Sequence, residues 1–164
     1  MIITHRTRKE WTERVRRLLG GVPCRVQVAA LPWRRRADGG FEVLMVTSRG
    51  TGRWVLPKGW QEKREMPHDA AAREAAEEAG VAGSISSTEL GRFYYFKQLP
   101  SGMEWRCEVR VYPMEVDQVA DKWPERKKRT RQWFRPEDAA LLVNEKDLGE
   151  LIAGFGANPR KFAA

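Results

Sequence analysis

Seven charged or glycine residues stand at fixed offsets within one short segment of the 164-residue chain. They are Gly59, Glu65, Arg73, Glu74, Glu77, Glu78 and Gly80. On an α-helix, residues spaced i, i+3 and i+4 share one face, so Glu74, Glu77 and Glu78 are predicted to converge. Like charges this close repel each other, so a cation is needed to compensate them. Carboxylate oxygens are hard ligands that favour Mg²⁺ or Mn²⁺, and water molecules and substrate phosphates complete the coordination of such an ion. The spacing therefore predicts a metal-dependent phosphate enzyme.

A solvated helix face is the competing interpretation of the same glutamates. In that interpretation Arg73 pairs with Glu77 at i+4, and the carboxylates only keep the chain soluble. The surrounding residues bear on this choice. With residue frequencies of about 5–8%, seven matched identities arise by chance on the order of once in 10⁸ start positions. The complete pattern thus favours the catalytic interpretation.

This segment resembles the signature of the Nudix hydrolases, which reads Gly, five residues, Glu, seven residues, Arg-Glu, an aliphatic residue, any residue, Glu-Glu, any residue, Gly and an aliphatic residue. The chain departs only at Ala75, where the family prefers a larger aliphatic residue. The resemblance implies an α+β fold, a Nudix-type α/β/α sandwich with a mixed β-sheet, a catalytic loop-helix-loop and flanking helices.

The resemblance also implies roles for the signature residues. Mg²⁺, with Mn²⁺ as a possible substitute, is expected to bind Glu74, Glu77, Glu78 and the carbonyl of Gly59. The candidate general bases are Glu78, Glu77 and Glu65, of which Glu78 is our first choice. Arg73 is expected to orient a signature glutamate through a charge-assisted hydrogen bond rather than to touch substrate.

Basic residues near the signature are candidates for binding substrate phosphates. Ser48 and Arg49, followed by Trp54-Val55-Leu56-Pro57, resemble the diphosphoinositol polyphosphate phosphohydrolase branch of the family, as does the basic segment 127–139. Members of that branch also cleave dinucleoside polyphosphates. The candidates carried over or suggested by their position are Arg25, Ser48, Arg49, Arg53, Lys58, Lys97 and Arg129. Trp60 stands where several branch members carry glycine, and either stacking on a nucleobase or packing beside the loop would suit it.

The elements that position these residues follow from local patterns. Pro67, Asp69 and Gly80 predict a helix over 66–79, preceded by a loop over 59–65. Hydrophobic spacing predicts an amphipathic helix over 7–19 with an arginine-rich polar face, and helices over 137–143 and 146–153. Strands are expected over 25–32, 41–48, 54–56, 89–99, 103–116 and 129–134, with hairpins joining the first two and the 89–99 and 103–116 strands.

Length and composition indicate one domain, because 164 residues can bury a core without disulfides or a structural metal. Within it we expect a helical extension at 1–22, the Nudix domain at 23–155 and a loose tail at 156–164. Cys24 and Cys107 are expected to behave as buried apolar side chains, and His5 and His68 share no zinc-ligand spacing. No signal peptide or membrane span is recognisable, so a cytoplasmic protein is expected.

A net charge of +8 indicates a polyanionic partner. The function expected is Mg²⁺-dependent hydrolysis of a phosphoanhydride bond in a dinucleoside polyphosphate or a diphosphoinositol polyphosphate. The alternatives are a nucleoside triphosphate or RNA 5′-end pyrophosphohydrolase, and a non-catalytic RNA-binding module of the same fold. A polyphosphorylated small molecule is the expected partner, with RNA less favoured and no membrane partner, and the protein is expected to be a monomer or small homo-oligomer.

Overall fold

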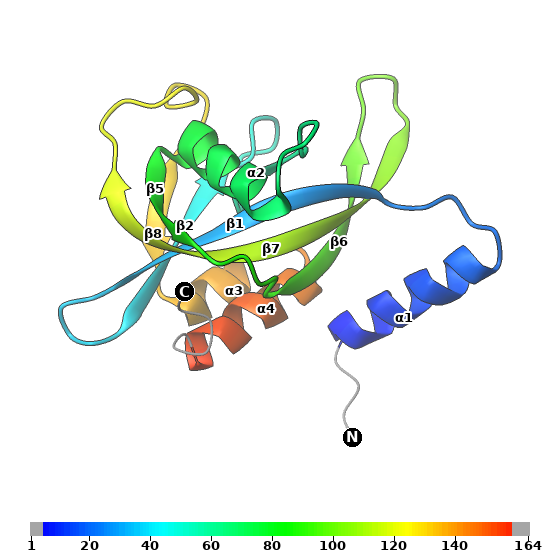
Figure 1. Ribbon diagram of the computed structural model, residues 1–164, viewed down its shortest axis with the longest axis horizontal. Coiled ribbons are helices and arrows are strands. Elements are labelled where there is room, and N and C mark those ends of the chain that lie inside the picture. The colour runs from blue at the N-terminus through cyan, green and yellow to red at the C-terminus, as the bar shows by residue number, and fades with distance from the viewer. Residues whose placement is uncertain (1–4, 159–164) are drawn as a thin grey trace.

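The computed structural model describes residues 5–158 and forms a mixed β-sheet with helices on both faces (Figure 1). In chain order, the elements are α1 (His5–Leu18), β1 (Arg25–Arg35), β2 (Phe41–Thr47), β3 (Trp54–Val55), β4 (Lys58–Gly59), α2 (Pro67–Glu74), the π-helical turn η1 (Ala75–Ala79), β5 (Val81–Ile85), β6 (Gly91–Gln98), β7 (Glu104–Val119), β8 (Arg131–Phe134), α3 (Pro136–Leu142) and α4 (Lys146–Ala157).

The long strand β7 organises the sheet. It runs parallel to β1, from Arg25 opposite Cys107 to Trp33 opposite Glu115, and antiparallel to β6 and β5. The main order is β3-β2-β1-β7-β5, with β4 on β1, β6 on β7 and β8 on β2. In Figure 1, α2 covers one face of the sheet, and α3 and α4 cover the other. The predicted α+β sandwich with a mixed sheet is therefore confirmed.

Two apolar clusters hold these layers together, one on each face of the sheet. Alternating residues of β1 contribute to both, so Val28 packs toward α2 whereas Ala29 packs toward α4. Four alanines of α2 and η1, Ala70, Ala71, Ala75 and Ala79, are fully buried and let the helix approach the sheet closely. Both predicted hairpins are present, β1 with β2 and β6 with β7.

The catalytic helix is not a single α-helix. It begins at Pro67, as predicted, and ends at Gly80, whose φ of 63° is the left-handed conformation that glycine adopts readily. Its last turn, however, is π-helical: the Gly80 N–H donates to the carbonyl of Ala75 as well as to that of Ala76. Outside groups bond to this turn, since the Glu77 carbonyl accepts from Glu125 N–H and the Ala79 carbonyl from Arg131. The uninterrupted α-helix predicted over 66–79 was therefore wrong in its last turn.

Several other boundaries also differ from the sequence prediction. Strand β1 continues past Pro32 because Trp33 to Arg35 pair with β2. Strands β4 and β5 were not predicted, and both are short and are defined by their pairing with long neighbours. Strand β8 begins at Arg131 rather than 129, and α4 continues to Ala157, into the segment expected to be a loose tail. The rest of that tail, from 159 onward, lies outside the described residues.

Both cysteines are free thiols buried in the sheet region, as predicted. Burial and, secondarily, a hydrogen bond to Glu13 raise the pKa of Cys24 to about 11. Burial also raises the pKa of Cys107. Both side chains therefore remain protonated at neutral pH and act in packing.

Candidate active site

Arg73 connects the loop and the helix of the signature. Its Nε donates to Glu65 Oε1 at 3.0 Å, and its Nη2 donates both to Glu65 Oε2 at 3.2 Å and to the Trp60 carbonyl at 3.0 Å. On the other side, Nη1 donates to Glu74 Oε1 at 2.9 Å. This network raises the pKa of Arg73, chiefly through the hydrogen bond with Glu65, and lowers that of Glu65. The guanidinium thus fixes both the loop and a helix carboxylate.

Glu74 is buried where the loop approaches the helix. A Cβ atom added to Gly59 would overlap the Glu74 carboxylate, so any larger residue at this position of β4 would force that carboxylate to move. Burial raises the pKa of Glu74, although the hydrogen bond from Arg73 opposes the shift. Gly59 and Glu74, both predicted to approach the metal, therefore lie in direct contact.

Glu78 is also buried, and two groups hold its carboxylate. The backbone N–H of Lys58 donates to Oε2 at 3.0 Å, and Arg129 forms a close ion pair with Oε1. Burial raises the pKa of Glu78, whereas the charge of Arg129 and the Lys58 hydrogen bond lower it, and burial prevails. A carboxylate whose pKa lies above its ordinary value is suited to accept a proton from water.

Glu77 differs from its two neighbours. Its side chain is 48% exposed, and its carboxylate contacts Arg73 Nη1 at 3.5 Å. The π-helical turn lies between Glu74 and Gly80, so α-helical spacing does not describe the relation of Glu77 to Glu74. The sequence placed all three glutamates on one face, and the structure buries only Glu74 and Glu78.

Four of the predicted phosphate-binding residues line one cavity of about 280 Å³: Ser48, Arg53, Lys58 and Lys97. Ser48 Oγ closes the loop before β3, because it contacts Thr51 Oγ1 at 2.7 Å and accepts from Arg53 N–H at 3.0 Å. Phe93, Tyr95 and Leu148 supply an apolar wall. Burial lowers the pKa of Lys58, while the charge of Glu78 opposes that shift. Lys58 joins the cavity to the buried glutamates.

Arg53 lies 3.6 Å from Glu145, which also lines the cavity, and Lys97 lies over the Trp60 ring. The other three predicted cations lie outside this lining and also have partners. The Arg25 guanidinium stacks on Trp105, 3.3 Å from the ring centroid. Arg49 Nη1 lies 3.4 Å from Glu125 Oε1, and Arg129 bonds to Glu78, Glu125 and the Thr47 carbonyl. Arg129 would bind phosphate only after releasing the glutamate that it holds in this structure.

Sequence reasoning missed three residues that shape the site. Glu125 pairs with both Arg49 and Arg129, and its i, i+4 spacing to Arg129 was a usable signal. Trp105 receives Arg25 on its face and the edge of Trp60, with ring centroids 6.1 Å apart. Tyr95 lies under the Lys58 ammonium at 5.3 Å. The tryptophan and the tyrosine carried no local signal, because β7 and β6 bring them to the site from distant sequence.

The carboxylates fit a hard divalent cation in chemistry, although in their present rotamers they bond to arginines. Among residues 5–158, no group of three or more His, Cys, Asp or Glu side chains is arranged to hold a metal ion as it stands. Glu74 and Glu78 are nevertheless buried oxygen donors with raised pKa values, which indicates that they lack sufficient positive charge. Oxygen donors of this kind suit Mg²⁺ or Mn²⁺.

A mixed sheet between helices, with buried glutamates beside a cation-lined cavity, defines a class of phosphate-processing hydrolases. The NUDIX domain model matches residues 25–155. The chain therefore belongs to the Nudix family, and it is an enzyme that hydrolyses phosphoanhydride bonds.

Relatives support this assignment over most of the chain. It is 34% identical to Nudix hydrolase 12, mitochondrial, of Arabidopsis thaliana over 93% of this chain and 78% of that protein. It is 37% identical to human diphosphoinositol polyphosphate phosphohydrolase 3-beta over 66% of this chain and 63% of that protein. The fold matches the Ap4A hydrolase of C. elegans with a TM-score of 0.58 at 21% identity, covering 82% of this chain and 97% of that one. Among the described helices, none has the length and apolar character that crossing a bilayer requires.

Proposed function

We propose that this enzyme catalyses the Mg²⁺-dependent hydrolysis of a phosphoanhydride bond in a polyphosphorylated substrate. The observation that supports this most is the position of Glu78, a buried carboxylate with a raised pKa, directly behind Lys58 of the cation-lined cavity. Glu74, Glu78, Glu77 and the Gly59 carbonyl would hold the metal. When bound, Mg²⁺ would neutralise phosphate charge and favour attack by water on phosphorus.

The chain's own residues would position the water, the carboxylates and the substrate phosphates. Glu78, once released from Arg129, accepts a proton from the attacking water. Arg73 keeps Glu65 and Glu74 in place through its hydrogen bonds. Lys58, Arg53 and Lys97 hold phosphate oxygens at the cavity and offset the charge that develops during cleavage. Arg25, Arg49 and Arg129 remain proposed phosphate ligands at its margin.

The substrate class that we propose is a dinucleoside polyphosphate or a diphosphoinositol polyphosphate. The relatives whose names carry these words support it, as do the cations around the cavity. The alternative substrate is a nucleoside triphosphate or an RNA 5′ end. A cytoplasmic location is part of the proposal, although relatives such as Nudix hydrolase 12 of Arabidopsis thaliana are named as mitochondrial.

A substrate panel tests the proposal directly. Purified enzyme with Mg²⁺ is given diadenosine tetraphosphate, a diphosphoinositol polyphosphate, nucleoside triphosphates and triphosphorylated RNA. Products are identified by phosphorus NMR, and ¹⁸O-labelled water locates the attacked phosphorus. We expect cleavage of one of the first two compounds at the highest kcat/KM. Exclusive cleavage of a simple nucleoside triphosphate would contradict the proposed class.

Replacing Glu78 with Gln tests the proposed base. The amide keeps the size of the side chain and one of its two oxygen acceptors but cannot take the proton, so kcat should fall about 10³-fold. Glu137→Gln is the matched control, because Glu137 is exposed on α3. Circular dichroism should show the same fold for both variants. Turnover of Glu78→Gln within a factor of about two of the parent would remove Glu78 from the mechanism.

A further inference from the structure

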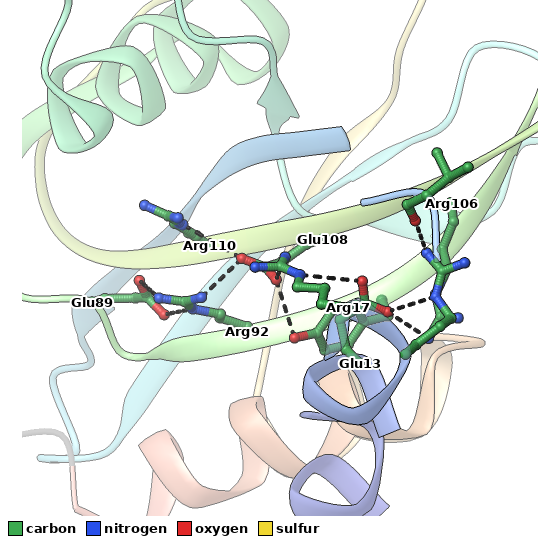
Figure 2. A network of polar contacts seen from close by, with 10 residues as sticks. Glu13, Arg17, Glu89, Arg92, Arg106, Glu108 and Arg110 are labelled. Atoms are coloured by element: carbon green, nitrogen blue, oxygen red, sulfur yellow. Dashed lines mark hydrogen bonds and ion pairs between the residues drawn. The ribbon is translucent and has the colours of Figure 1, made fainter. Parts of the chain in front are cut away.

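Helix α1 attaches to the body of the protein by its charged face. Figure 2 shows Glu13 turned inward among arginines, and its residue is only 2% exposed. Arg106 of β7 approaches Glu13 Oε2 to 3.2 Å, and Arg16 and Arg17 of the same helix contact the carboxylate at 3.4 and 3.5 Å. Burial raises the pKa of Glu13, but the hydrogen bonds from Cys24 and Arg16 and the charge of Arg106 outweigh it, so the pKa is lowered. Glu13 is therefore a charged anchor.

Two buried carboxylates of the body bind the same face of α1. Arg17 Nη2 lies 3.3 Å from Glu108 Oε2, in a network that also includes Arg92 (Figure 2). Lys9 Nζ lies 3.2 Å from Asp147, which is fully buried in α4. Rotating α1 about its axis would remove Lys9 from Asp147, and loss of the cation beside a buried carboxylate is strongly destabilising. It would also remove Arg17 from Glu108, which would keep its ion pair with Arg92. The ion pairs therefore fix which face of α1 points outward.

The outward face is apolar. Trp11, Val15, Leu18 and Leu19, which we call the outer stripe, share one side of the helix by their spacing of four, three and one residues. Trp11 is 67% exposed and Leu18 is 86% exposed. Amphipathic helices of globular proteins normally turn such a stripe toward the core. Here the core-facing side is ionic and the stripe is exposed to solvent, which indicates a surface for a partner.

The charge of α1 identifies the kind of partner. Between His5 and Leu18 the helix carries six arginines and lysines and two glutamates, one of which is the inward Glu13. Three of the cations, Lys9, Arg16 and Arg17, pair with the inward carboxylates. The remaining cations of the helix are Arg6, Arg8 and Arg14. Two copies of the helix would bring these arginines together, which disfavours a second copy of this chain. Nucleic acid would use the cations, but it has no counterpart for adjacent exposed leucines. An anionic lipid surface suits both the apolar stripe and the cations, because the stripe can contact acyl chains while the cations contact anionic head groups.

We propose that α1 is an interfacial helix, whose outer stripe inserts at the surface of a membrane that contains anionic phospholipid. The ion pairs of Glu13, Arg17 and Lys9 hold the body of the enzyme on the opposite side of the helix. From the sequence we expected no membrane partner, because no spanning segment is recognisable, but a helix that lies in the interface requires none. Binding would concentrate the hydrolase at a membrane surface.

Vesicle flotation with the full chain tests this inference. Vesicles of phosphatidylcholine with about a third phosphatidylglycerol are compared with vesicles of phosphatidylcholine alone. We expect flotation with the anionic vesicles, at least about tenfold weaker binding to the neutral ones, and loss of binding as salt is raised. No flotation with the anionic vesicles would overturn the proposal, as would equal binding to both.

A matched pair of substitutions tests the stripe itself. Leu18→Glu should weaken binding to anionic vesicles about tenfold or more, because it removes one leucine that would insert into the membrane and adds a negative charge. Leu141→Glu is the control, since Leu141 on α3 is 85% exposed, like Leu18, and lies outside the stripe. Hydrolytic activity in solution should be unchanged in both. Equal loss of binding in both variants, or no loss in Leu18→Glu, would overturn the proposal.

Light scattering tests whether a second copy of the chain, rather than a membrane, covers the outer stripe. If the stripe joined two copies of the chain, the parent would be a dimer in solution and Leu18→Glu a monomer, and the membrane assignment would be overturned. We expect the same mass for both proteins without lipid.

Discussion

Arg73 joins more of the site than any single glutamate does. One planar guanidinium bonds Glu65 through two nitrogens, Glu74 through a third contact and the carbonyl of Trp60. A lysine ammonium carries the same charge but is a point donor that cannot reproduce this fork. The requirement at this position is therefore for geometry as well as for charge.

Arg73→Lys should lower kcat about 10²-fold, because Glu65 and Glu74 would lose a shared constraint on their positions. Steady-state kinetics with the best substrate of the panel measures the change. Arg35→Lys is the control, since the Arg35 side chain is 53% exposed and its ion pair with Glu115 is long, at 4.0 Å. A kcat for Arg73→Lys equal to that of the control would show that positive charge alone is sufficient.

At the scale of elements, the π-helical turn and its glycine stop determine where Glu77 and Glu78 lie. Gly80 combines a positive φ with close contact, because a Cβ atom there would lie 2.7 Å from the Trp123 side chain. Gly52 has a similar φ of 65° and open space around it. Comparing substitutions at the two glycines therefore separates the energetic cost of the left-handed backbone from the cost of steric contact.

Replacing either glycine with alanine should cost about 1–2 kcal/mol for the left-handed conformation. Only Gly80→Ala should add about 1–3 kcal/mol for overpacking against Trp123. Urea unfolding measures the free energy of unfolding of both variants, and we expect Gly52→Ala to be the more stable of the two. Equal losses of stability would mean that the Trp123 side chain moves aside without cost.

Local sequence patterns predicted most elements but not the details created by tertiary contacts. The signature, the hairpins and the helix ends were readable because turn residues and hydrophobic spacing act locally. The π-helical turn depends on groups from residues 125 and 131, and β4 and β5 depend on long neighbouring strands. The amphipathic pattern of α1 was read correctly, whereas its orientation depends on Glu108 and Asp147, far away in the sequence.

The same limit applies to the candidate site. Residue identity located Ser48, Arg53, Lys58 and Lys97, which the structure brings to one cavity. Residue identity could not reveal that Arg25 stacks on Trp105 and that Arg129 pairs with Glu78, because folding of the sheet and the helix brings these distant residues together.

At the scale of the whole molecule, burial of the Glu74 and Glu78 carboxylates should oppose folding in the absence of a metal ion. Glu74 and Glu78 have pKa values raised above 4.5, so the folded state binds more protons than the unfolded state above that pH. The free energy of unfolding should therefore decline as pH rises from 4.5 through their raised values. Glu13 and Glu65 have the opposite effect, because their pKa values are lowered in the folded state. Their ionised forms stabilise the folded state above pH 4.5, and this contribution is lost as the pH falls below that value.

Urea unfolding in chelator between about pH 5 and about pH 8 measures this decline. Glu78→Gln should show a flatter dependence, because its amide does not titrate. Adding Mg²⁺ should raise the stability of the parent enzyme at the upper end of this range, since a ligand that binds only the folded state stabilises it. A parent curve that rises with pH in chelator would contradict the assigned shifts.

The parallel pairing of β1 with β7 has a consequence for biosynthesis. Because β1 is translated early and its central partner late, the first half of the sheet leaves the ribosome with an unpaired apolar strand edge. The nascent chain must keep that edge from associating with other chains until β7 is complete. Pausing or truncation before β7 should therefore yield aggregates rather than a smaller folded core.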